Sequence, residues 1–207
     1  MAYFSNKDIS ELNHFYKINL INSCSGYKSA NLIGTKSASG ISNVAIFSSV
    51  IHLGSEPALL GFILRPNTVT RNTYDNIKET GVYTINHVHQ AIIEEAHHTS
   101  AKYDSSISEF DMTTLEEDYL NHFHAPYVKH APVQMGMKYV EEYAIKENGT
   151  ILLIGEIQHL NINDPLLKED GFVNLSEAHV VAINGLDGYA LPISPTRLDY
   201  QRPRKIS

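Results

Sequence analysis

The feature that most constrains the fold is a series of short, strand-length segments separated by turn residues. The clearest is the run from Ala58 to Leu64, which is apolar throughout and lies between Pro57 and Pro66. A run of this length without polar positions suits a strand that is buried on both faces. Gly and Pro interrupt the neighbouring segments in the same way. The chain is therefore expected to be built mainly from β-strands.

The remaining segments extend this pattern. Strands are predicted at residues 31–35, 42–50, 82–88, 134–145, 150–161 and 178–183, and helices at 7–16, 70–80, 91–103 and 113–123. Asn148 and Gly149 predict a type I′ hairpin between two strands, because both residues tolerate a positive φ. Thr70 or Asn72 is expected to cap the second helix, and Gly81 to end it. Many short strands with few helices favour a β-barrel with helical decorations over alternating βαβ units.

Length and composition set further limits. The chain has 207 residues, of which 43% are hydrophobic and 19% charged, and no linker or repeat divides it, so a single domain is expected. A net charge of -7 argues against nucleic acid or an anionic membrane as a partner. No apolar run approaches the roughly 20 residues of a membrane span, and no secretory signal is recognised at the start. The single cysteine, Cys24, excludes an intramolecular disulfide, and a cytoplasmic protein is the plain expectation.

The loop from Arg65 to Thr73 has the composition of a phosphate site. It contains two arginines, three threonines and two asparagines and no acidic side chain. The guanidinium fork matches phosphate oxygens, and the N-terminus of the helix that follows favours an anion. The loop has no Gly-x-Gly-x-x-Gly and no Gly-Lys-Ser/Thr, so a Rossmann or P-loop nucleotide site is not indicated. A small phosphorylated cofactor is expected, and a surface loop that caps a helix is the alternative.

The strand segment from Asn43 to Ser49 offers a surface for a flat aromatic ring. Ile46 and Phe47 are apolar, and Ser48, Ser49 and the strand edge supply groups that hydrogen-bond to heteroatoms. An ordinary strand with serines on its solvent face explains the same residues about as well.

Histidines raise the question of a metal. The chain has 11 of them, including the pairs His87-x-His89 and His122-x-His124, but it lacks His-Glu-x-x-His and Cys-x-x-Cys. Scattered histidines without a metal are the better account. The segment from His97 to Tyr103 gathers hydrogen-bond donors at a predicted helix end, which fits a ligand pocket or a frayed terminus.

These pieces occur in an order that resembles the flavin reductase-like family, which has an FMN-binding split β-barrel. The resemblance is carried by residues 43–49, 54–62, 65–77, 81–86, 96–103, 108–111, 151–157 and 198–203. It covers roughly residues 20–203, with residues 1–19 as an N-terminal extension of a single domain spanning 1–207. The region around Gly185 to Tyr189 matches the family's nicotinamide-receiving segment only loosely.

The resemblance implies a homodimer with one FMN per subunit near the interface. The residues it implies for the cofactor are Phe47, Ser48 and Ser49 beside the isoalloxazine, Arg65, Thr70, Arg71 and Thr73 at the phosphate, Asn86 near the flavin edge, and His97, Thr99, Ser100 and Tyr103 lining the pocket. Asn43 and Ile46 are further candidates for binding the cofactor. No side chain is expected to act as an acid or base, because the flavin performs the redox chemistry.

The leading functional hypothesis is an FMN-dependent oxidoreductase. NADH or NADPH would reduce the bound FMN by hydride transfer, and the FMN would then reduce a flavin or another small acceptor. One alternative is a flavin-binding electron carrier or sensor that a protein partner reduces. Another is a haem- or metal-binding split barrel that uses some of the histidines.

Overall fold

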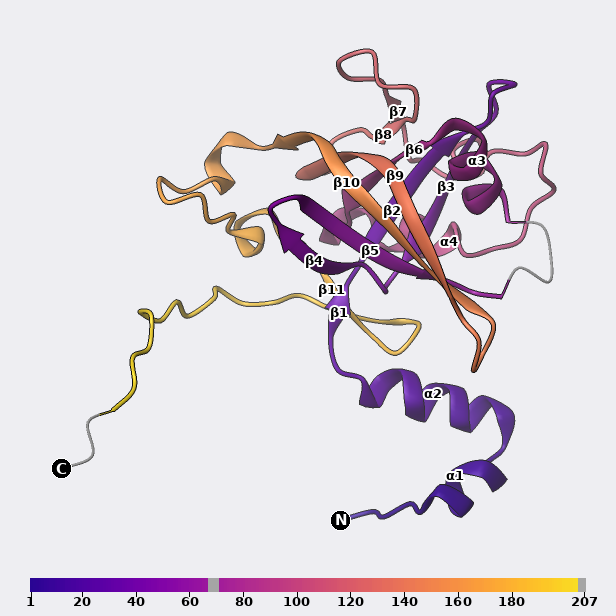
Figure 1. The fold of residues 1–207 in the computed structure, drawn as a ribbon, viewed down its shortest axis with the longest axis vertical. Coiled ribbons are helices and arrows are strands. Elements are labelled where there is room, and N and C mark those ends of the chain that lie inside the picture. The colour runs from indigo at the N-terminus through magenta and orange to yellow at the C-terminus, as the bar shows by residue number, and fades with distance from the viewer. Residues whose placement is uncertain (67–70, 205–207) are drawn as a thin grey trace.

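An antiparallel β-sheet forms the body of the protein. The computed structural model describes residues 1–66 and 71–204 (Figure 1). The large sheet has the strand order β3-β2-β6-β9-β10-β5-β4, and its neighbouring strands are antiparallel. Its strands are β2 Asn31–Lys36, β3 Ser42–Phe47, β4 Ile51–Ser55, β5 Ala58–Leu64, β6 Val82–His87, β9 Val133–Ile145 and β10 Thr150–Ile162. The expected mainly β architecture is confirmed.

Shorter elements surround this sheet. The small strands are β1 Lys28–Ser29, β7 Glu117–Asp118, β8 Tyr127–Val128, β11 Ala182–Asn184 and β12 Gly188–Ala190. The α-helices are α1 Asn6–Glu11, α2 His14–Cys24, α3 Asn72–Thr80 and α4 Ile93–His98, and the 3-10 turns are η1 Gln90–Ile92, η2 Asp164–Leu166 and η3 Leu175–Ala178. Helices α1 and α2 form an arm that extends away from the sheet, as does the C-terminal segment (Figure 1).

The sheet curves until β3 meets β5, although these strands are not neighbours in the strand order. Beyond the end of β3, the Ser49 hydroxyl accepts from the Ile63 N–H at 3.0 Å and lies 3.2 Å from the Ile63 carbonyl oxygen, to which it donates. The rings of Phe47 and Phe62 make an edge contact with centroids 5.1 Å apart. Side chains therefore close the barrel where the strand ladder does not.

Two apolar clusters occupy the two faces of the sheet. The first fills the barrel and contains Ile33, Phe62, Leu64, Ile77, Tyr83, Ile85, Val133, Met135, Met137, Leu153 and Leu166. The second, here called the outer cluster, contains Ala30, Leu32, Val44, Val88, Ala96, Phe110, Leu115, Val128, Ala131, Val181 and Ile183. Because side chains alternate along a strand, Phe47 packs against the first cluster and Ile46 against the outer one.

The predicted helix at 113–123 is wrong. This segment forms turns and the short strand β7, which pairs with β8. Leu115 is buried in the outer cluster, and the Lys129 N–H donates to the Glu116 carbonyl oxygen at 2.9 Å. Pairing with the next strand, β8, and burial of Leu115 therefore override the local helical pattern.

Three other predicted helices are confirmed with different bounds. The first breaks at Leu12 because the Asn13 side chain accepts from the Phe15 N–H at 3.1 Å and caps a second helix, α2. The helix predicted at 91–103 ends at His98. Helix α3 ends at Gly81, as predicted, with a φ of 74°, but its N-cap position is occupied by Arg71.

Two strand predictions also need correction. The strands around Asn148 and Gly149 do form a hairpin, but Gly149 alone has a positive φ (72°) and its N–H donates to the Ile145 carbonyl oxygen at 2.8 Å. The loop is therefore longer than a two-residue type I′ turn. The predicted strand at 178–183 begins later, at Ala182, because η3 occupies the preceding residues.

His87 generates a prediction about stability. It lies opposite Asn31 in the register of β6 and β2, and the His87 Nδ1 and Asn31 Oδ1 atoms are buried without a hydrogen-bond partner. Burial lowers the pKa of His87 from 6.5 to about 4. The unfolded chain therefore takes up a proton at a higher pH than the folded protein, and stability is lost as pH falls from about 6.5 toward 4.

We expect the unfolding free energy of His87→Gln to fall less on acidification than that of the native chain. The difference should be on the order of 3 kcal/mol. Urea denaturation of both proteins at neutral and mildly acidic pH measures the difference. Equal pH dependence of the unfolding free energy in the two proteins would contradict the assignment.

Candidate functional site

Strand β3 is a terminal strand of the large sheet, so one of its backbone edges has no neighbouring strand among the described residues. The Val44 N–H points to this open edge and donates to Glu109 Oε2 at 3.1 Å. Backbone groups alternate in direction along an antiparallel strand, so the N–H and C=O of Ile46 face the same edge. The edge beside Phe47 and Ser48 therefore offers a backbone donor and acceptor to a ligand.

Glu109 ties the loop after α4 to this strand. Its residue is only 7% exposed, and burial raises the pKa of its carboxyl group. With the Asn43 amide oriented to satisfy both neighbours, its nitrogen donates to Glu109 Oε2 at 3.1 Å and its oxygen accepts from Thr73 Oγ1 at 3.0 Å. Thr73 lies in the first turn of α3. Side-chain bonds thus join the loop, β3 and α3 in one connected unit.

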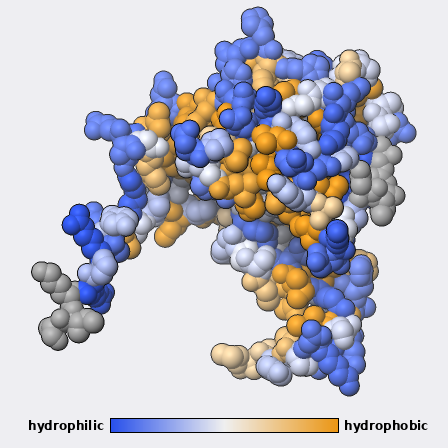
Figure 2. Space-filling model, in the orientation of Figure 1, coloured by the Kyte–Doolittle hydropathy of each residue, from blue (hydrophilic) through white to orange (hydrophobic). Residues whose placement is uncertain are grey.

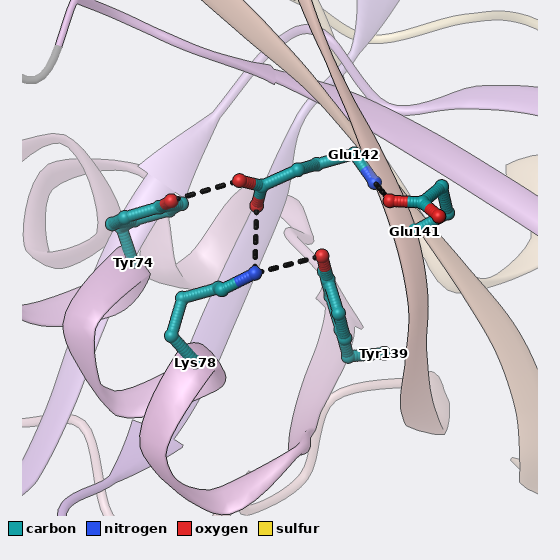
Figure 3. Close-up of polar contacts among 5 residues, drawn as sticks. All are labelled: Tyr74, Lys78, Tyr139, Glu141 and Glu142. Atoms are coloured by element: carbon teal, nitrogen blue, oxygen red, sulfur yellow. Dashed lines mark hydrogen bonds and ion pairs between the residues drawn. The ribbon is translucent and has the colours of Figure 1, made fainter.

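A polar network fixes the position of α3 over the sheet (Figure 3). Tyr74 donates to Glu142 Oε1 at 2.9 Å, and Lys78 donates to Tyr139 at 2.8 Å and to Glu142 Oε2 at 3.3 Å. The hydrogen bond to Tyr139 raises the pKa of Lys78, so the ammonium group stays charged. Burial raises the pKa of Tyr74, which keeps its hydroxyl protonated as a donor. These contacts from β9 set the direction in which the helix axis points.

One arginine stands at the N-terminus of α3, and a second follows β5. Arg71 occupies the N-cap position without a side-chain cap bond, and its Nε donates to the Pro66 carbonyl oxygen at 3.2 Å. Arg65 follows β5 and is exposed. Thr70, the other candidate for the phosphate, lies outside the described residues. A helix N-terminus whose N-cap residue makes no side-chain cap bond and carries a guanidinium group is an arrangement that attracts an anion.

The end of α4 brings together part of the predicted pocket lining. His97 Nδ1 lies 3.1 Å from the Tyr189 hydroxyl, and His98 Nε2 lies 2.6 Å from the Tyr103 hydroxyl. Thr99 is buried, and its hydroxyl donates to the Ala96 carbonyl oxygen at 2.7 Å. Ser100 is exposed. Tyr189 packs against the outer cluster, as Ile46 does, so this group belongs to the face of β3 opposite Phe47.

The side chains of two predicted site residues form hydrogen bonds within the protein. Asn86 is fully buried, donates to the Leu32 carbonyl oxygen at 3.1 Å and accepts from the Val128 N–H at 3.0 Å. The Ser49 hydroxyl is held by Ile63, as described above. Both side chains connect strands, and their cofactor roles stay predictions.

Two hollows lie near these elements. One, of about 220 Å³, lies beside the first half of β3 and the start of α3; it is lined by Ser37, Ser39, Ile41, Ser42, Asn43, Asn72, Asp75, Asn76 and Ser105. The other, of about 430 Å³, is lined by His89, Gln90, Ala91, Ala178 and His179. Phe47, Ser48 and Ser49 line neither of these two hollows.

Sequence reasoning did not assign roles to Glu109 and Tyr189. A lone glutamate in a loop normally reads as a solvated side chain, and nothing local marks Glu109 as buried. Tyr189 lies 92 positions after His97, the residue that it contacts. Only the tertiary structure pairs them.

Across residues 1–66 and 71–204, no group of three or more His, Cys, Asp or Glu side chains could hold a metal ion. In the same part of the chain, no helix has the length and apolar character needed to cross a membrane.

Comparison with known proteins identifies the family. Residues 26–177 match the model of the flavin reductase like domain, which covers most of the chain, so the protein belongs to this family. A crystal structure from Shewanella frigidimarina NCIMB 400, provisionally assigned as a flavin reductase with a split barrel domain, is 46% identical with a TM-score of 0.94 and covers 97% of this chain and 100% of that one. The split β-barrel fold inferred from sequence is confirmed.

A more distant solved structure shares the fold, and a further protein is similar in sequence. The flavoredoxin of Desulfovibrio vulgaris (Miyazaki F) is 21% identical with a TM-score of 0.69, covering 84% of this chain and 90% of that one. An uncharacterised protein of Methanothermobacter thermautotrophicus is 28% identical over 152 residues, which are 71% of this chain and 69% of that protein. Family membership and the 46% identical structure together support a flavin-related oxidoreductase.

The connection through Glu109 generates a second prediction. Glu109→Ala leaves the buried Val44 N–H and the Asn43 amide without their acceptor, which should cost about 1–3 kcal/mol of unfolding free energy. Glu109→Gln keeps one acceptor oxygen and should cost markedly less. Urea denaturation of the three proteins tests this, and equal losses in the two variants would show that the hydrogen bonds are not the cause.

Proposed function

We propose that this protein is an FMN-dependent oxidoreductase that takes electrons from NADH or NADPH and reduces a flavin or another small acceptor. The proposal is supported by membership of the flavin reductase-like family. The observation that carries it is the open edge of β3. Hydrogen bonds connect this strand to the N-terminus of α3 and to the loop after α4.

The residues present fit a flavin mononucleotide. Its ring system needs a flat apolar surface and a few hydrogen-bond partners, which Phe47, Ser48 and the backbone of Ile46 offer. Its phosphate needs donors and positive potential, which Arg65, Arg71 and the first turn of α3 offer, with Thr70 as a further candidate. When bound, FMN supplies a ring that can accept a hydride from a nicotinamide and pass electrons on.

The protein's own contribution is to bind and orient. Asn43 and Thr73 keep β3 and the α3 N-terminus in register, so the two ends of the cofactor are held by one rigid unit. Glu109 fills the first half of the strand edge and leaves the second half to the ligand. We assign Asn86 and Ser49 a structural role, which is to hold the strands around the cofactor surface in place. We assign the segment at the end of α4 to the side of the cofactor pocket, with the residues His97, Thr99, Ser100 and Tyr103.

The choice of electron donor can be tested directly. If NADH or NADPH is the donor, mixing either with the yellow protein without oxygen should bleach the flavin absorption band. A flavin that stays oxidised with both nucleotides, but bleaches with dithionite, would instead favour an electron carrier reduced by a protein partner. That outcome would leave flavin binding intact and refute the proposed reductase activity.

The phosphate site gives a second test. Arg65→Ala with Arg71→Ala should weaken FMN binding by about 100-fold or more, because charge-assisted hydrogen bonds are each worth roughly 1.5–3 kcal/mol. Arg197→Ala is the matched control, since that guanidinium pairs with Asp170 at 2.6 Å in the C-terminal segment. Fluorescence titration with FMN measures both. Unchanged affinity in the double variant would show that the phosphate binds elsewhere.

We also propose that the protein works as a homodimer with the flavin near the subunit interface. In the single chain the cofactor surface along β3 is open on one side, so a second subunit would complete its enclosure.

A further inference from the structure

The proposed FMN site leaves the hollow of about 220 Å³ beside the start of β3 without a role. Its walls come from the turn between β2 and β3, the first residues of β3, the first half of α3 and the loop after α4. Of its nine lining side chains, four are serines and three are asparagines, and the others are Ile41 and Asp75. Hydrophobic surface lies elsewhere, over β4, β5 and β10 in the middle of the viewed face (Figure 2). We call this polar site the serine hollow.

Buried side chains in fixed positions form one wall of the serine hollow. Ser42 is 8%, Asn43 4% and Asn76 8% exposed. Asn76 Nδ2 donates to Thr35 Oγ1 at 3.0 Å, and a hydrogen bond of 2.9 Å joins the hydroxyls of Ser42 and Ser108. Buried polar side chains that are held by hydrogen bonds keep one geometry. The wall is therefore preformed, as the walls of small-molecule sites usually are.

One atom of this wall has no partner in the protein. With Asn76 oriented to donate to Thr35, no hydrogen bond from residues 1–66 and 71–204 reaches its Oδ1 atom. This oxygen is not among the unpartnered atoms that are sealed from solvent, so it opens into the hollow that the residue lines. Because buried polar atoms are normally paired, an acceptor in this position favours a ligand that brings a donor.

The lining selects a neutral ligand with several hydroxyl groups. Serine hydroxyls and asparagine amides both donate and accept hydrogen bonds, as the hydroxyls of a sugar do. Asp75 is exposed at the hollow, and none of the nine lining side chains is cationic. A phosphate inside the hollow would therefore be repelled. A ribose fits better, because a carboxylate beside a nucleotide commonly accepts from the ribose 2′-hydroxyl.

The serine hollow adjoins the proposed phosphate site. Asn72 lines the hollow and directly follows Arg71, the N-cap residue of α3. Asn43 also lines it, and its amide oxygen accepts from Thr73 at 3.0 Å. The order along β3 is therefore the ring surface at Phe47, then the phosphate donors, then the hollow. A ligand with a phosphate at Arg71 can place its next group in the hollow.

We infer that the serine hollow binds the ribose of a nucleoside 5′-phosphate whose phosphate lies at the N-terminus of α3. Asp75 accepts from the 2′-hydroxyl, and Asn76 Oδ1 accepts from the 3′-hydroxyl. The same group occurs in the AMP half of FAD and in the AMP half of NADH. The inference rests on the phosphate site of the proposed function and adds a nucleoside to the ligand that this site takes.

AMP and 2′-deoxy-AMP are the probes that test the ribose directly, because they share the base and the phosphate and differ in one hydroxyl. NMR titration of the full-length native chain should find AMP bound at least about 10-fold more tightly, since a hydrogen bond to a carboxylate is lost with the hydroxyl. In Asp75→Ala the two nucleotides should bind alike, and FMN affinity should be unchanged. Equal affinity of the native chain for both nucleotides would overturn the inference.

Two further variants separate recognition of the ribose from general effects. Asp199→Ala removes the same charge from an exposed residue of the C-terminal segment, so it should keep the native preference for AMP. Ser39→Phe places a large side chain on the exposed turn that lines the hollow, so it should block AMP and leave FMN binding intact. Thermal denaturation checks that each variant folds. AMP binding that survives Ser39→Phe would place the nucleotide outside the hollow.

Competition with AMP distinguishes the two sources of the nucleoside. If the source is FAD, the native chain should bind FAD at least about 10-fold more tightly than FMN, and Asp75→Ala should remove this advantage. If the source is NADH, it should displace AMP, whereas NADPH should do so at least about 10-fold less well, because its 2′-phosphate meets the Asp75 carboxylate.

The fate of the inference can be separated from that of the proposed function. A chain that binds FMN but neither AMP, FAD nor NADH through the hollow would refute the inference and leave the proposed flavin site standing. A chain that prefers AMP to 2′-deoxy-AMP as expected but binds no FMN would support the inference and refute the proposed function.

Discussion

The backbone groups on the outer edge of a terminal strand need partners other than a neighbouring strand, and the two halves of β3 differ in whether the described residues supply them. In its first half the Glu109 carboxylate accepts the Val44 N–H, and the same carboxylate fixes the Asn43 side chain, which reaches Thr73 in α3. In its second half the edge at Ile46 is left open. One requirement of backbone chemistry therefore both anchors the surrounding loop and helix and leaves a place for a ligand.

The alternation of side chains along β3 explains why both faces of this strand matter. Phe47 packs into the barrel against Phe62, whereas Ile46 joins the outer cluster together with Tyr189, the contact of His97. A residue pair that looks like one apolar surface in the sequence is thus divided between two cores. The proposed cofactor would bind at the edge of β3, which lies between its two faces, and not on either face alone.

Local sequence patterns predicted the elements whose signals are strong. The apolar run from Ala58 to Leu64 is β5 with the predicted bounds, and Gly81 ends α3 in the left-handed conformation that glycine adopts without strain. Prediction was wrong at 113–123, where Leu115 is drawn into the outer cluster and β7 pairs with β8. Among the candidate site residues, Asn43 and Thr73 are in direct contact, and the buried Asn86 side chain hydrogen-bonds to the Leu32 carbonyl oxygen within the sheet.

The sequence by itself determined a mainly β chain of this family, a glycine-terminated helix after an arginine-rich loop, and a strand with polar residues at its end. The family follows from the resemblance that the ordered segments carry, and the strand and helix follow from periodicity and turn chemistry, which are local properties. Only the tertiary structure decided that Glu109 is buried on the edge of β3, that Ser49 closes the barrel through Ile63, and that one half of the sheet keeps an apolar outer face. These depend on contacts between residues far apart in the chain, and strand register, which no local pattern specifies, places them together.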